Sequence, residues 1–187
     1  MMKLGALILA CFTLSACTYQ SLTKEQCLSG DWKGIGYQDG VLGQYPDRIV
    51  EHAEACADTG VRPDINAWQK GREEGLKYYC TADNFYRLGI NGYAIHYVCD
   101  KAKMPQLQKI YRQAYEQYDL QQKISSAQQQ IRENEITLEK LKRGEMLTYK
   151  TETEARAELL RLQNQIWDLK QHIEQYQNSL QQAKLKE

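Results

Sequence analysis

WKGIGYQDG at residues 32–40 and WQKGREEG at residues 68–75 each place a Trp a few residues before a Gly-x-x-x-Gly pair. Glycines four residues apart lie on one face of a helix, and without side chains they let another backbone come close. Each glycine costs a helix roughly 1 kcal/mol relative to Ala, so a close helix contact is the reason to place them there. The two pairs, Gly36 with Gly40 and Gly71 with Gly75, are therefore predicted to form a packing groove.

The sequence around these pairs predicts short capped helices. Asp64 after a Pro is a helix start signal, and it predicts a helix over about 65–79. Thr81 in turn begins a short helix that ends at Gly89. The residues that follow alternate as in a strand, so a turn at 90–92 is predicted before Tyr93, Ile95 and Tyr97.

Glycine and cysteine divide the chain into a compact part and a long helical part. Ten of the twelve glycines lie between residues 27 and 99, and four cysteines lie there too. In an oxidising compartment an even number of cysteines predicts two disulfides, which a core of this small size needs. A local fold-back favours Cys80 with Cys99, but all three pairings stay open for Cys27, Cys56, Cys80 and Cys99. We expect a two-disulfide module over 27–103.

The chain begins with a short apolar run, GALILACFTLSA at residues 5–16. About twelve residues are too few to span roughly 30 Å of hydrocarbon, but they suit the core of a signal peptide. The run ends in LSAC, which resembles the lipobox of bacterial lipoproteins. The resemblance implies that residues 1–16 are removed and that Cys17 becomes a diacylglyceryl cysteine with three acyl chains. Residues 17–26 then form a lipidated linker.

This anchor decides the expected compartment. Three acyl chains hold a protein on a membrane without spanning it. In the sorting rule of Gram-negative lipoproteins, an Asp after the lipidated Cys retains the protein in the inner membrane. This chain has Thr18 at that position, which implies the outer membrane. We expect the protein to face the periplasm. The alternative is an ordinary secretory peptide cut elsewhere, which leaves Cys17 as a plain thiol, and the sequence does not say which leaflet displays the protein.

The C-terminal part carries a coiled-coil seam. Apolar residues recur at alternating spacings of three and four, which is the a/d pattern of a helix that packs along another helix. The seam is formed by Leu159, Leu162, Ile166, Leu169, Ile173, Tyr176 and Leu180. Thr151 with Glu154 forms a capping box at its start.

An earlier arm of the same region, from residue 105, has a looser seam interrupted by Gln117, Gln121 and Gln128. Gly144 is the only glycine after residue 105, so we expect an antiparallel helical hairpin over 105–187 with its tip near 143–150. The fold class predicted is mainly α-helical. A hairpin of this kind is expected to contact an envelope protein partner or a second copy, and the oligomeric state stays open.

Composition argues against several functions. The formal net charge is zero, so no field concentrates nucleic acid, and no nucleic-acid partner is expected. The candidates for catalysis or metal binding are Asp31, Asp39, His52, His96 and the cysteines. They form no recognised catalytic motif and no C-x-x-C pair, and an oxidising compartment favours disulfides over zinc, so we expect no enzyme, no metal and no cofactor.

Aromatic residues leave one alternative function. Ten of them lie between Trp32 and Tyr97, and interleaved Trp and Tyr can stack on sugar rings, which makes an envelope glycan such as peptidoglycan a possible ligand. The competing interpretation is that these rings complete a small core with their polar tips in water. We favour the core interpretation, and with it a non-enzymatic structural or adaptor protein that acts through its coiled coil.

The compact part also resembles a family of small Gram-negative lipoproteins classed only as a domain of unknown function. The resemblance covers about residues 20–100 and implies the compartment and the module, but no catalytic residue. It rests on the order of Cys27, Gly30, Asp31, Trp32, Gly36, Asp39, Gly40, Gly43, His52, Cys56, Pro63, Asp64, Gly71, Arg72, Gly75, Tyr79, Cys80, Gly89, Gly92 and Cys99.

Overall fold

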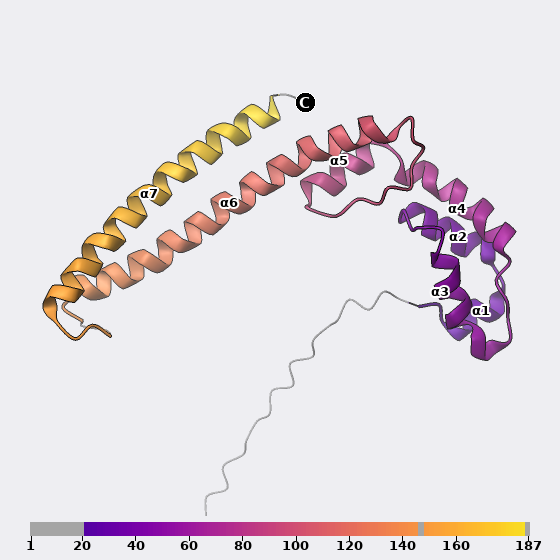
Figure 1. Cartoon of the computed structure of the whole chain (residues 1–187), viewed down its shortest axis with the longest axis horizontal. Helices are drawn as coiled ribbons and strands as arrows, with labels where there is room; N and C mark the ends of the chain where they lie inside the picture. Colours follow the sequence, from indigo (N-terminus) through magenta and orange to yellow (C-terminus); the bar gives the residue numbers. More distant parts are fainter. Residues whose placement is uncertain (1–20, 146–147, 186–187) are drawn as a thin grey trace, which may run out of the picture.

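The computed structural model describes residues 21–145 and 148–185, and within them the chain is helical without any strand. The mainly α-helical class is therefore confirmed (Figure 1). The predicted signal peptide and Cys17 lie outside the described residues. None of the described helices is long and apolar enough to cross a bilayer. The elements are α1 (Lys24–Ser29), α2 (Trp32–Val41), α3 (Arg48–Ala55), the 3-10 helix η1 (Ala57–Thr59), α4 (Ile65–Tyr79), α5 (Ala82–Ile90), α6 (Met104–Lys142) and α7 (Glu152–Lys184).

The four predicted glycines bring α2 and α4 together as parallel neighbours. A Cβ atom on Gly36 would collide with the carbonyl oxygen of Trp68, and one on Gly71 would collide with that of Lys33. Gly40 and Gly75 repeat the arrangement one turn further along each helix. Each helix thus supplies two gaps that receive the backbone of the other, which is a reciprocal form of the packing groove.

A disulfide holds α1 and α3 beside this helix pair. Cys27 of α1 is bonded to Cys56 at the end of α3, and both are fully buried with Trp32 and Trp68. As the sequence suggested, Asp64 caps α4, its side chain accepting a hydrogen bond from the backbone N–H of Ala67 at 3.0 Å. The structure joins Cys80 to Cys99 as the second bridge, which is the local pairing favoured above.

The first turns of α6 belong to the compact part. Met104 and Leu107 are buried in one cluster with Tyr79 and Phe85, so packing continues across residue 103. α5 lies along α6, and Gly89 allows this approach because a Cβ there would collide with the α6 backbone at Tyr111. The alternating residues after Gly92 form an irregular connection with no ladder partner, so the strand-like pattern did not produce a strand.

The rest of α6 forms an antiparallel hairpin with α7, as predicted (Figure 1). Thr151 and Glu154 form the capping box that starts α7. Leu162 and Ile166 are buried against the α6 side chains of Ile131, Leu138 and Leu141. The other predicted seam residues are half-buried on the same face of α7: Leu159, Leu169, Ile173, Tyr176 and Leu180. Of the three interrupting glutamines, Gln117 is buried, whereas Gln121 and Gln128 are exposed.

Candidate functional site

A buried cluster of polar side chains, the polar cluster, joins α2, α3 and α4. Its members are Asp39, Arg48, His52, Trp68 and Arg72. Oδ2 of Asp39 accepts two hydrogen bonds, from the indole Nε1–H of Trp68 at 2.8 Å and from Nε2 of His52 at 2.7 Å. Nε of Arg48 lies 4.0 Å from the other carboxylate oxygen, and Arg48 also pairs with Glu51. The carboxylate is therefore compensated by a cation and two donors while only 7% exposed.

Arg72 connects the same cluster to the loop after α2. Its Nε and Nη2 donate to the carbonyl oxygen of Gln44 at 2.8 and 2.6 Å, and its guanidinium lies over the Trp68 ring at 5.9 Å from the centroid. Burial lowers the pKa of Arg72, which nonetheless stays charged because arginine does not deprotonate in proteins. The fixed fork of Arg72 therefore sets the position of this loop relative to α4.

Three members of the polar cluster, Asp39, Arg48 and His52, line a groove of about 690 Å³ that α1, α2, α3 and His96 surround. Asp39 and His52, which the sequence offered as separate candidates, meet here. The other two candidates have structural partners: Asp31 caps α2 by accepting from the N–H of Gly34, and Nδ1 of His96 donates to the carbonyl of Gly43. The Ser29 hydroxyl at the rim donates to a backbone carbonyl. Among the described residues, the lining of the groove thus offers hydrogen-bonding groups.

No three His, Cys, Asp or Glu side chains in the described part of the chain are arranged to hold a metal ion. All four cysteines described, Cys27, Cys56, Cys80 and Cys99, are in disulfides. The groove is lined by amide, carboxylate and imidazole side chains.

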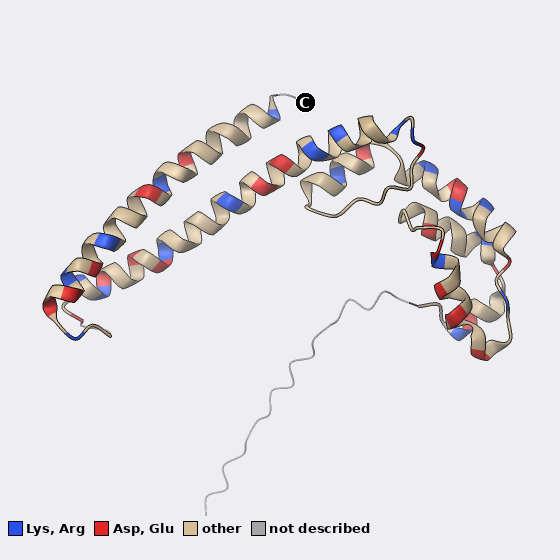
Figure 2. Ribbon diagram, in the orientation of Figure 1, with Lys and Arg blue, Asp and Glu red and all other residues tan. Residues whose placement is uncertain are grey.

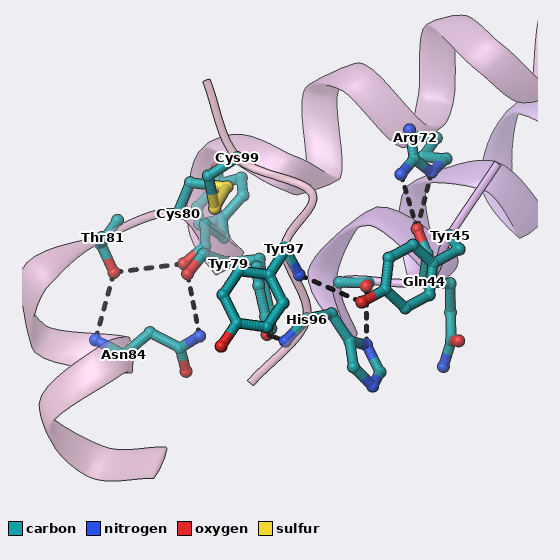
Figure 3. Close-up of a disulfide and its surroundings, with 12 residues drawn as sticks. Gln44, Tyr45, Arg72, Tyr79, Cys80, Thr81, Asn84, His96, Tyr97 and Cys99 are labelled. Atoms are coloured by element: carbon teal, nitrogen blue, oxygen red, sulfur yellow. Dashed lines mark hydrogen bonds between the residues drawn. A yellow bond between two sulfur atoms is a disulfide. The ribbon is translucent and has the colours of Figure 1, made fainter. Parts of the chain in front are cut away.

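The Cys80–Cys99 disulfide fastens the irregular connection to the end of α4, and two tyrosines add further links (Figure 3). The phenol oxygen of Tyr79 accepts from the N–H of His96 at 2.7 Å, and that of Tyr45 accepts from the N–H of Tyr97 at 3.2 Å. Burial raises the pKa of Tyr79, which keeps its phenol protonated. The connection therefore links the loop after α2 to the end of α4.

The two tryptophans proposed for sugar stacking belong to the core. Trp32 is 4% exposed and Trp68 is 3% exposed, so neither presents a ring face to a ligand. The interpretation of these rings as core is the one that the packing supports. Exposed aromatic rings in the compact part are instead those of Tyr45, Tyr78, Tyr93 and Tyr97.

The hairpin carries a second candidate surface that the periodicity did not single out. Leu160 is 60% exposed and Trp167 is 63% exposed, although the seam of the same helix faces α6. These two residues are seven apart, so they lie on one line, the outer face of α7, with Gln163 and Asn164 between them. The seven-residue spacing of Leu160 and Trp167 could have predicted this surface from the sequence. The longer apolar pattern of the seam on the same helix drew attention away from it.

Charges are sparse in the second half of α7 and in the middle of α6 (Figure 2). Between residues 171 and 183 the only charged residue is Glu174, and between 120 and 131 it is Lys123. The long glutamine-rich stretches leave hydrogen-bonding amides rather than charge on the solvent side of both helices.

The extent of the compact unit matches a known family. Residues 31–116 match the family model described as "Protein of unknown function (DUF2799)". This confirms the resemblance to an uncharacterised family, with bounds that begin after Cys27 and end inside α6 rather than near residue 100. The end is physically sensible because α5 packs against α6 at Tyr111, Ala114 and Tyr115, so the DUF2799 region needs the start of that helix.

The DUF2799 region contains the glycine contacts and the polar cluster, whereas α7 and its outer face lie beyond it. No curated protein and no solved structure matches the chain. The family therefore identifies the compact unit without supplying a ligand or a reaction.

Proposed function

We propose that the chain is an outer-membrane-anchored periplasmic lipoprotein that acts as a non-enzymatic structural or adaptor protein through its hairpin. The observation that carries this is the exposure of Leu160 and Trp167 on a helix whose seam is already packed. A largely exposed Trp leaves apolar area in water, and burying it against a partner would be favourable. Trp is also one of the residue types found most often among the few residues that contribute most of the binding energy of an interface.

The anchor in this proposal is Cys17. Three acyl chains at about 0.8 kcal/mol per buried CH₂ hold the protein on the membrane. α6 has 39 residues and would extend about 58 Å at 1.5 Å per residue, so the hairpin tip can lie well away from the compact part. Such a geometry suits a protein that positions or contacts another envelope component.

The polar cluster supports the non-enzymatic part of the proposal. Oδ2 of Asp39 is engaged by two donors, Trp68 and His52, and each of these side chains belongs to a different helix. Both donors belong to the helix packing of the compact part, so the fold alone accounts for the position of this carboxylate oxygen.

The test is photo-crosslinking in living cells. A photoreactive residue at Asn164, on the outer face of α7, is expected to give a covalent adduct with an envelope protein, whereas one at Gln165, about 100° further round the helix, should give less. Cys17→Ser is the control for the anchor, since it should release the chain from the membrane fraction and abolish the adduct. Equal labelling at both positions, or no adduct, would count against a binding face on α7.

A second function, binding of an envelope glycan, is favoured by the groove rather than by the tryptophans. Its lining includes side chains that hydrogen-bond sugars well, among them Asp31, Gln38 and Gln44. If this function holds, the chain should sediment with purified peptidoglycan, and Gln38→Ala should reduce the bound fraction severalfold because Gln38 is exposed at the groove. Gln129→Ala, on the exposed side of α6, is the matched control, and equal sedimentation of both variants would exclude the groove.

A further inference from the structure

We propose that the outer face of α7 binds the same face of a second copy of this chain in antiparallel orientation. This rests on the proposed function, because it names the partner of the same surface. The residues concerned are Leu160, Trp167, the two amide residues between them, Gln163 and Asn164, and two charged residues beyond the ends, Arg156 and Glu174. Each lies on the side of α7 that the seam leaves in solvent.

The spacing of the apolar residues makes the face self-complementary. A two-fold axis between Gln163 and Asn164 places Leu160 of one copy opposite Trp167 of the other, and the same contact occurs twice. The two residues are about 10.5 Å apart along the helix at 1.5 Å per residue, so both contacts form with the helices side by side. The same axis sets Gln163 of one copy opposite Asn164 of the other, and these side-chain amides can pair because each both donates and accepts.

The charges select the antiparallel orientation. A parallel pair would place Arg156 against Arg156 and Glu174 against Glu174, which is repulsive at both ends. In the antiparallel pair Arg156 of each copy lies opposite Gln171, within one turn of Glu174 of the other copy, so both ends carry opposite charges. Arg156 is able to make this contact at little cost because its pairing with Glu152 is between side chains that are 81% exposed.

Other partners fit this face less well. An interfacial membrane helix needs a broad apolar side flanked by basic residues, and this face has only two large apolar side chains with one cation. A different protein recognised by charge would find no charged residue along this line between Leu160 and Trp167, where Gln163 and Asn164 stand. A second copy of the chain can bind this face without any charged residue at its centre, because the central amides pair with each other.

The proposal is tested by sedimentation of residues 18–187, which include every helix described. A concentration-dependent dimer is expected, and Trp167→Gln should raise its dissociation constant at least tenfold. Ile136→Gln, at an equally exposed apolar residue on α6, is the matched control and should leave the constant unchanged. Arg156→Glu and Glu174→Arg should each weaken the dimer, and the two together should restore it.

The orientation has a separate readout. With an antiparallel axis beside Asn164, Asn164→Cys should form an intermolecular disulfide readily, whereas Asn178→Cys should not because the two copies of residue 178 lie far apart. A monomer at all concentrations, or a dimer indifferent to Trp167→Gln, overturns the proposal. Efficient crosslinking at residue 178 would overturn the antiparallel arrangement. Since these measurements use the purified chain, a failure here leaves an in-cell adduct with a different protein, and with it the adaptor function, intact.

Discussion

Replacing Gly36 or Gly71 by Ala is expected to unfold the pair formed by α2 and α4. A Cβ on either glycine would overlap a carbonyl oxygen of the opposite helix, and a backbone carbonyl cannot move aside as a flexible side chain can. Separating the helices to relieve the overlap would also open the contacts of Trp32 and Trp68. We expect a loss of about 3 kcal/mol or more in the free energy of unfolding, although Ala itself favours the helix by roughly 1 kcal/mol.

The measurement is urea unfolding followed by tryptophan fluorescence. Trp167→Phe in the background removes the exposed indole, so that the signal reports only Trp32 and Trp68. Gly34→Ala is the matched control in α2, because a Cβ there meets only the side chain of Asp31, and turning that side chain away costs no more than one cap hydrogen bond, about 1 kcal/mol. If Gly36→Ala were as stable as Gly34→Ala, the close approach of the two helices would be refuted.

These contacts show which parts of the fold can be predicted from sequence. The glycine pairs, the cap at Asp64 and the capping box at Thr151 are local patterns, and each one forms in the structure as expected. The seam of α7 is equally local because residues three and four apart must share a face. Such signals depend only on helix geometry, which the chain itself specifies.

The double use of α6 was not predictable in the same way. Its apolar residues continue from Leu107 to Leu141 without a break in helix, so the pattern suggests one seam and one partner. In the structure Leu107 and Ala114 pack toward the compact part, whereas Ile131 and later residues face α7. The change of partner along one helix depends on where α5 folds back, and periodicity carries no information about that.

The polar cluster was missed as a unit for a related reason. The hydrogen bonds of Asp39 reach residues 13 and 29 positions away, and they exist only because the fold brings His52 of α3 and Trp68 of α4 to Asp39 of α2. The sequence marked Asp39 and His52 by their chemistry but did not indicate that they meet. The sequence also suggested sugar stacking by the Trp68 ring. In the structure the ring is buried, and its indole N–H donates a hydrogen bond to Asp39.

Asp39→Ala should destabilise the chain by about 3–5 kcal/mol in the free energy of unfolding. The change leaves the N–H groups of Trp68 and His52 without an acceptor and Arg48 without its buried counter-charge, and removing one partner of a buried pair is costly by about this amount. Asp39→Asn keeps the shape and one oxygen, so it should lose less. Asp58→Ala, at an exposed position after α3, should have little effect.

Urea unfolding of the same Trp167→Phe background compares these variants, and Trp68→Phe completes the series by deleting one donor while keeping an aromatic ring. Because Trp68→Phe removes the group that Asp39 serves, the combined loss in Asp39→Ala with Trp68→Phe should be smaller than the sum of the two single losses. Full additivity would show that the bond between these side chains contributes nothing. A stable Asp39→Ala chain would reverse the assignment, since a carboxylate unnecessary for folding in a groove of this size would then be held there for a ligand.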